Sequence, residues 1–159
     1  MTSTDKDTPR MADLRVFHLL QKAHSALFRA ADKRGRQEMD LSTSQMAVLI
    51  ILLNDGALPA TELATQLSMA NSGVTGLVDR LCARGLVSRR PAAADGRSIL
   101  VCLEPEGEAL ALRARAETRA YNATLLAPFS PQEREVIHRF LTHLHKNAEA
   151  IINAGGQHD

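Results

Sequence analysis

Residues 59–103 constrain the fold of this chain more than any other stretch. Apolar side chains recur at helical spacing first over 61–67 and again from Val74 to Leu81, and the residues between them favour turns and helix caps. Gly85 then ends the second helix, as glycines commonly do just past a helix C-terminus. Alternating apolar side chains predict two strands, and these are 86–90 and 98–103. This order of elements predicts a helix-turn-helix followed by a β-hairpin wing.

The second helix of this motif has an outer face made mostly of small residues. Gly73 and Gly76 each cost about 1 kcal/mol relative to Ala inside a helix. Small residues allow a helix to approach another surface closely, and the floor of the DNA major groove is such a surface. The alternative is that both glycines pack against the preceding helix. The first interpretation makes the candidate DNA-binding residues of this helix Asn71, Ser72, Gly73, Thr75, Gly76 and Arg80.

The predicted hairpin region is rich in arginine. Residues 80–97 hold five arginines and one acid, although the formal net charge of the whole chain is only +1. An arginine at a hairpin tip, here Arg97, suits the narrow and electronegative minor groove of DNA. We expect Arg89 and Arg90 to lie along the DNA backbone, and we hypothesise that Asp95 holds Arg97 in position. An ordinary solvated loop is the alternative.

Three sequence motifs occur together in and after the hairpin region. They are DRL-x-x-x-GLV-x-R at Asp79–Arg89, D-x-R at Asp95–Arg97 and L-x-P-E-G at Leu103–Gly107. With this combination the chain, over roughly residues 11–153, resembles the MarR family of bacterial transcriptional regulators. Glu104 stands where that family usually has Thr, a difference that changes a helix cap and from which we expect no functional consequence. The resemblance implies a homodimeric DNA-binding regulator, usually a repressor, that responds to a ligand.

The chain before the motif predicts two further helices. The first spans 11–38 and has a polar exit around Gly35. Ser42 begins the second as an N-cap, and Gln45 completes a capping box. In the MarR family the N-terminus of this helix approaches a DNA phosphate, which makes Ser44 and Gln45 candidate DNA contacts. Helix capping is the alternative role for this segment.

The C-terminal third predicts two long helices. One begins near Glu104, and the other begins at Ser130, where Glu133 completes a second capping box. With the first helix they carry apolar stripes of about 20 residues, roughly 30 Å long. A winged motif of about 65 residues is too small to cover three such stripes. We therefore expect a homodimer with a mainly α fold, comprising a disordered tail at 1–10, dimerisation helices at 11–38 and 104–153, and a winged helix-turn-helix at 41–103 that includes a short strand at 57–59.

The resemblance also implies a ligand. Members of the MarR family usually respond to small aromatic or phenolic acids, which bind in a crevice between the dimerisation helices and the winged region. Polar anchors in such an apolar cleft would come from the first helix and from the helix after the wing, while exposed helix faces are the alternative interpretation. The candidate ligand-binding residues are His18, Gln21, Lys22, Ser25 and Arg113. A regulator that senses oxidants through Cys82 is a second alternative.

No catalytic or metal-binding pattern accompanies these features. The sequence has no phosphate-cradling glycine loop and no nucleophile elbow, and His138, His143 and His145 lack the spacing that lets one helix chelate a metal. No apolar run is long enough to cross a membrane. We therefore predict a cytoplasmic regulator without cofactor or metal, whose partners are double-stranded DNA and a second copy of the chain. The rival classes are a helical protein-interaction module without DNA binding and an enzyme that modifies a small molecule.

Overall fold

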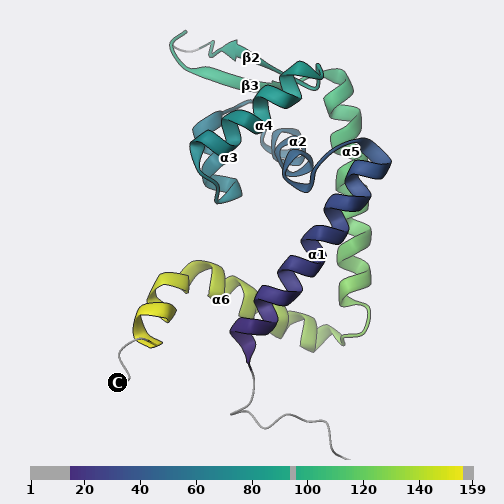
Figure 1. Cartoon of the computed structure of the whole chain (residues 1–159), viewed down its shortest axis with the longest axis vertical. Coiled ribbons are helices and arrows are strands. Elements are labelled where there is room, and N and C mark those ends of the chain that lie inside the picture. Colours follow the sequence, from purple (N-terminus) through teal and green to yellow (C-terminus); the bar gives the residue numbers. More distant parts are fainter. Residues whose placement is uncertain (1–14, 94–95, 156–159) are drawn as a thin grey trace, which may run out of the picture. The chain divides into compact units, whose positions relative to one another are not determined.

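The computed structural model describes residues 15–93 and 96–155 (Figure 1). It confirms the predicted fold class, mainly α with a small β wing. The chain divides into two compact units, one ending at Ala114 and the other beginning at Arg115. The predicted tail at 1–10 and the predicted helix start at Met11 lie outside the described residues. The elements are α1 (Val16–Met39), α2 (Thr43–Asp55), β1 (Leu58–Pro59), α3 (Ala60–Leu67), α4 (Asn71–Ala83), β2 (Val87–Pro91), β3 (Ile99–Leu103), α5 (Pro105–Leu126) and α6 (Pro131–Gly155).

Helix α1 continues past the point where the sequence predicts its polar exit. The predicted end near 38 agrees with the observed end at Met39, which Asp40 follows with a left-handed φ of 52°. Only the interpretation of the polar residues around Gly35 as the exit is wrong, because they lie inside the helix. Gly35 is buried inside the helix, where a Cβ atom would lie 2.6 Å from Met46 Cε and 2.7 Å from the Leu41 carbonyl oxygen. Glycine at this position therefore serves the close packing of α1 against the start of α2 and does not end the helix.

The first turn of α2 is held by side chains from two helices. Ser42 Oγ accepts a hydrogen bond from the Gln45 N–H at 3.1 Å, and Gln45 Oε1 accepts one from the Ser42 N–H at 2.9 Å, which confirms the predicted capping box. Asp32 of α1 accepts from the Thr43 N–H at 2.9 Å and from Arg36 Nε at 2.8 Å. These bonds lower the pKa of Asp32, and the bond from Arg36 has the largest effect. The junction of α1 and α2 is therefore tied by a charge-assisted network.

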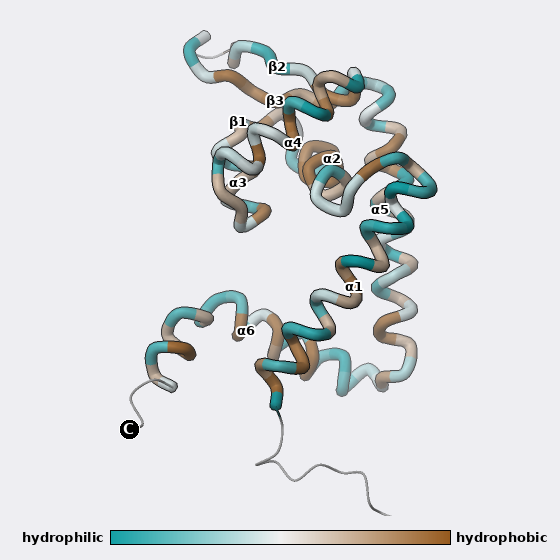
Figure 2. The backbone as a smooth tube through the Cα atoms, viewed as in Figure 1, coloured by the Kyte–Doolittle hydropathy of each residue, from teal (hydrophilic) through white to brown (hydrophobic). Residues whose placement is uncertain are grey.

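The core of the first unit lies between α2, α3, α4 and the sheet. Leu49 on α2, Leu63 on α3 and Leu81 on α4 are fully buried, and Val101 of β3 closes the core from the sheet. Helix α2 is apolar along most of its length (Figure 2). The antiparallel sheet has the order β1-β3-β2, and Leu58 of β1 pairs with Val101, which confirms the predicted short strand. The winged region thus supplies most of this core, and Met39 of α1 with Ala111 and Ala114 of α5 complete it.

Helices α5 and α6 differ in how much they bury. At the start of α5 a Cβ atom on Gly107 would lie 1.9 Å from the Leu86 carbonyl oxygen, so only glycine fits there. Helix α6 contains no buried residue. Its predicted capping box is confirmed, because Glu133 Oε2 accepts from the Ser130 N–H at 2.8 Å and Ser130 Oγ accepts from the Glu133 N–H at 3.3 Å. A kink at Asn147, where φ is −125°, was not apparent from the apolar spacing.

Candidate nucleic-acid interface

The outer face of α4 is open to solvent. The apolar stripe of this helix is buried in the core, whereas five of its six candidate DNA-binding residues are exposed and Gly76 is half-buried. A Cβ atom on Gly73 would meet only Met69 Cε at 3.4 Å, and one on Gly76 would meet only Arg80 Nη1 at 3.5 Å. Both are ordinary contacts with flexible side chains, so packing within the chain does not require either glycine. The small residues leave room for an external surface.

Thr75 and Arg80 on the open face of α4 differ in how they are held. Thr75 Oγ1 donates to the Asn71 carbonyl oxygen at 2.9 Å, so its hydroxyl can still accept a hydrogen bond from outside while its methyl group remains available for contact. Arg80 is exposed, and no acceptor for its guanidinium lies within hydrogen-bonding distance among the described residues. The open face of α4 therefore combines hydrogen-bonding groups with one cation that has no carboxylate beside it.

The arginines of the wing strand are paired with acids from other elements. Arg89 Nη2 binds Asp79 Oδ1 of α4 at 2.7 Å, and Arg89 Nη1 lies 3.9 Å from Cys82 Sγ. Arg90 Nη2 binds Glu104 Oε1 at 2.6 Å. The carboxylate of Glu104 thus holds one of the candidate DNA-binding arginines, a contact that the sequence did not reveal. Sequence reasoning missed both pairs because their partners lie 10 and 14 residues away.

Arg84 connects the end of α4 to the junction of α1 and α2. Its guanidinium donates to the carbonyl oxygens of Asp40 and of Met39, the latter at 3.5 Å, and lies 3.7 Å from the Asp40 carboxylate. It therefore donates hydrogen bonds to carbonyl oxygens that have no partner within the helix at the C-terminus of α1. A cation at this end also complements the helix dipole. The sequence does not reveal this contact, because Arg84 and Asp40 lie 44 residues apart.

The tip of the wing is described in part. Arg97 is exposed, and Gly96 beside it has a left-handed φ of 63°. Asp95, which we hypothesised to hold Arg97, lies outside the described residues. Arg97 stands beyond the paired part of the hairpin, since the β2–β3 register ends with Pro91 opposite Ile99.

The N-terminus of α2 presents only one of its two candidate DNA contacts. Gln45 is 8 % exposed, and its side-chain amide is used in the capping box, so the capping role predicted as the alternative is confirmed. Ser44 is half-buried and faces an open cleft. The Thr43 N–H is already bound by Asp32, which leaves Ser44 as the residue of this turn that can meet a phosphate.

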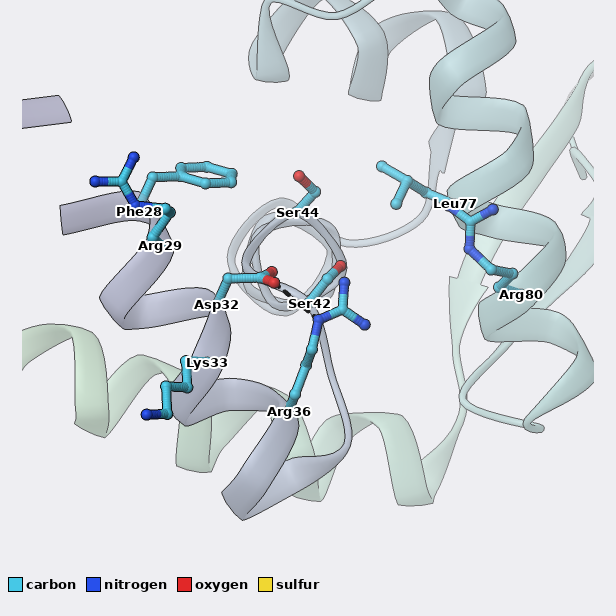
Figure 3. A pocket seen from close by; sticks show the side chains of 9 residues that line it. All are labelled: Phe28, Arg29, Asp32, Lys33, Arg36, Ser42, Ser44, Leu77 and Arg80. Carbon is cyan, nitrogen blue, oxygen red and sulfur yellow. Dashed lines mark hydrogen bonds and ion pairs between the residues drawn. The ribbon is translucent and has the colours of Figure 1, made fainter. Parts of the chain in front are cut away.

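The cleft beside Ser44 lies between α1, α2 and α4, in the first unit (Figure 3). Its volume is about 720 Å³. Figure 3 shows Asp32 and Arg36 from α1 meeting in front of the start of α2, with Leu77 and Arg80 of α4 opposite. The cleft combines four cations, one carboxylate and two apolar side chains, and its lining residues are Phe28, Arg29, Asp32, Lys33, Arg36, Ser42, Ser44, Leu77 and Arg80.

The candidate ligand-binding residues are not among those that line this cleft. His18, Gln21 and Lys22 are exposed on α1, and Ser25 is half-buried. Arg113 of α5 forms an ion pair with Glu38 at 3.1 Å. The candidates on α1 lie in its first half, whereas the residues of α1 that line the cleft lie in its second half. The signal available in the sequence was the cluster of cations between Arg29 and Arg36.

The described residues offer little for other kinds of chemistry. Within 15–93 and 96–155, no three His, Cys, Asp or Glu side chains gather in a way that would hold a metal ion. Nor is any described helix long and apolar enough to cross a membrane. Cys82 and Cys102 are both free and half-buried.

Comparison with known proteins agrees with this geometry. The sequence pattern of the MarR family matches residues 41–99. An uncharacterized HTH-type transcriptional regulator of Bacillus subtilis, YfiV, is 30 % identical over 112 residues, which cover 70 % of this chain and 70 % of that protein. The match includes the helix-turn-helix and extends beyond it.

Solved structures give the same result over most of the chain. A probable transcriptional regulator from Pseudomonas aeruginosa is 33 % identical, with a TM-score of 0.70 over 85 % of this chain and 99 % of that one. BpsR of Bordetella bronchiseptica, whose DNA binding is regulated by 6-hydroxynicotinic acid, is 27 % identical, with a TM-score of 0.71 over 82 % and 98 %. The fold, the open face of α4 and these similarities together show that the chain belongs to the MarR family of transcriptional regulators.

Proposed function

We propose that this chain is a homodimeric repressor that binds a pseudo-palindromic DNA site and is released by a small aromatic acid. The observation that carries the DNA-binding part is the outer face of α4, where two glycines not required by packing stand beside Asn71, Ser72 and Arg80. Asn and Ser reach base edges in the major groove, and Arg binds guanine or phosphate there. As a regulator of transcription it acts in the cytoplasm, where bacterial DNA lies.

The proposed homodimer rests on exposed apolar side chains. Phe17 on α1 is 73 % exposed, Val136 and Ile152 on α6 are 52 % and 60 % exposed, and α6 buries nothing in the single chain. Apolar surface left exposed on each of these helices marks a protein interface. A second copy of the same chain would cover it and would place two α4 helices for a two-fold DNA site.

The proposed ligand class follows from the cleft between α1, α2 and α4. Phe28 supplies an aromatic ring that is 42 % exposed, and Arg29, Arg36 and Arg80 supply positive charge around it. This combination fits a small aromatic carboxylate, with its ring on Phe28 and its anion on an arginine. Arg80 also belongs to the open face of α4. A bound acid that pairs with its guanidinium therefore competes with DNA for this side chain and favours the DNA-free state.

Fluorescence anisotropy with the duplex upstream of the protein's own gene tests DNA binding. A scrambled duplex and the variants Arg80→Ala, Arg97→Ala and Arg119→Ala run alongside, each at two salt concentrations. We expect preferential binding that falls steeply with salt, and an approximately ten-fold loss in Arg80→Ala, since a base or phosphate contact is worth about 1–3 kcal/mol. Arg119 is exposed on α5 outside the winged region, so Arg119→Ala should bind like the wild type.

Equal losses in all three arginine variants would show that only net charge matters and would reject the interface. Addition of a hydroxybenzoate then tests the ligand class, because release should disappear in Phe28→Ala while DNA binding without ligand is retained. Sedimentation at micromolar concentration tests the homodimer, and a monomer would reject it.

A further inference from the structure

Three side chains at the base of the wing form a closed set of hydrogen bonds. Ser88 and Arg90 lie two residues apart on the same face of β2, and Glu104 follows the last residue of β3. Glu104 Oε1 accepts from Ser88 Oγ at 2.5 Å and from Arg90 Nη2 at 2.6 Å. Arg90 Nε in turn donates to Ser88 Oγ at 3.1 Å. The Glu104 N–H donates to the Leu86 carbonyl oxygen at 3.0 Å, so the backbone that carries the carboxylate is fixed as well.

The two charges of this set are not equally exposed. The Glu104 side chain is 26 % exposed, whereas the Arg90 side chain is 61 % exposed. Two guanidinium nitrogens of Arg90, Nε and Nη2, face inward to Ser88 and Glu104, and no acceptor for Nη1 lies within hydrogen-bonding distance among the described residues. The guanidinium is therefore held along one edge and presents the other edge to solvent.

The carboxylate remains ionised at neutral pH. The hydrogen bond from Ser88 lowers the pKa of Glu104 most strongly, and the hydrogen bond from Arg90 lowers it further. A negative charge on a surface that meets DNA repels phosphates, and Glu104 therefore opposes binding unless it has a compensating effect. A compensating effect is available, because an arginine fixed before association loses less side-chain freedom when it binds.

We propose that Glu104 is a positioning residue for DNA binding. Together with Ser88 it orients the Arg90 guanidinium so that its solvent-facing edge meets a phosphate of the DNA backbone. The inference rests on the proposed DNA-binding function. It makes the wing base a prearranged phosphate contact.

The sign of one measurement separates positioning from simple electrostatics. If Glu104 only repels DNA, Glu104→Gln binds more tightly than the wild type. If Glu104 positions Arg90, Glu104→Gln binds about five-fold more weakly, within the range of coupling between residues in direct contact. Glu106→Gln is the matched control, since Glu106 is an exposed acid in the first turn of α5, two residues farther along, for which the structure shows no contact with Arg90.

Fluorescence anisotropy measures binding to a mixed-sequence duplex at low salt. Base sequence does not matter here, because phosphate contacts do not depend on it. The proteins compared are the wild type, Glu104→Gln, Glu106→Gln, Arg90→Ala and the double variant Glu104→Gln/Arg90→Ala. Thermal melts exclude unfolded samples. A loss in Glu104→Gln that is absent in the Arg90→Ala background, with Glu106→Gln unchanged or slightly tighter, supports the proposal. Tighter binding by Glu104→Gln, or an equal loss in both backgrounds, overturns it. A wild type that binds no duplex rejects the proposed function itself, a result distinct from either.

Discussion

The helices of the winged region and helix α6 carry similar apolar stripes, but only the former bury them within the chain. Leu81 of α4 and Leu49 of α2 are 0 % exposed, whereas Leu141 of α6 is 49 % exposed and α6 buries no residue. An apolar stripe therefore shows that a helix needs a covering surface, but it does not show which surface supplies the cover. Three predictions test this difference, from the largest expected effect to the smallest, and a fourth tests the charge network at the junction of α1 and α2.

Truncation in the winged core should have the largest effect on stability. Leu81→Ala removes a fully buried side chain and should lower the free energy of unfolding by about 2–5 kcal/mol, because of the lost burial and the cavity left behind. Urea denaturation measures this. Leu141→Ala is the matched variant in α6, and its cost should grow with protein concentration if a second copy covers that face. A loss of unfolding free energy for Leu81→Ala no larger than that for Leu141→Ala would show that the two regions do not differ in how they bury their apolar side chains.

A charge on the apolar face of α6 should disrupt self-association. Phe140→Glu places a carboxylate on the face that we expect a second copy to bury, and should weaken the dimer about thirty-fold or more, as substitution of a central interface residue does. Sedimentation equilibrium measures the dissociation constant. Arg139→Glu introduces the same group on the opposite face and should leave the dimer intact. Equal effects of both variants would show that this face is not the interface.

The two capping boxes allow the same change to be made in both regions. Ser42→Ala should lower the free energy of unfolding by about 1 kcal/mol, because the Gln45 N–H loses its acceptor in the half-buried first turn of α2. Ser130→Ala removes the corresponding bond at the exposed start of α6 and should cost less, since water replaces the hydroxyl. Thermal melts compare the two variants. A larger cost at Ser130 would mean that the start of α6 is buried in the assembled protein.

The Asp32 network should make stability depend weakly on pH. The pKa of Asp32 is lowered on folding, mainly by the hydrogen bond from Arg36, so its contribution is present above the ordinary pKa of 3.8 and is lost as the pH falls through the lower folded-state value. Asp32→Asn should cost less than about 1 kcal/mol at pH 7, and the difference from the wild type should shrink in acid. Melts at neutral and acidic pH measure this. A difference that stays constant would show that the charge of Asp32 does not matter.

Much of the local structure could be predicted from the chain alone. Both capping boxes join residues three positions apart, so Ser42 with Gln45 and Ser130 with Glu133 are visible in the sequence. The helical spacing from Val74 to Leu81 likewise separates the buried stripe of α4 from its open face. The sequence also predicts a short strand at 57–59, which the structure has at Leu58–Pro59, although it could not show which strand it pairs with.

The contacts that the sequence did not reveal share one cause. The neighbours of Gly35 are polar and suggest a helix exit, but its role depends on Met46 of α2 and on Leu41 just before that helix. Glu104 and Arg90 lie 14 residues apart, and Arg84 reaches Asp40 across 44 residues. The cleft was missed for the same reason, since it takes residues from three helices.

The sequence by itself determined the elements of this protein, their caps, the buried and open faces of α4 and the family, because each depends on spacings of a few residues. Only the tertiary structure decided which acid holds each arginine, which glycine exists for close packing and where a cleft opens. Those features depend on distances between side chains that are remote in the chain, and only the folded backbone brings them together.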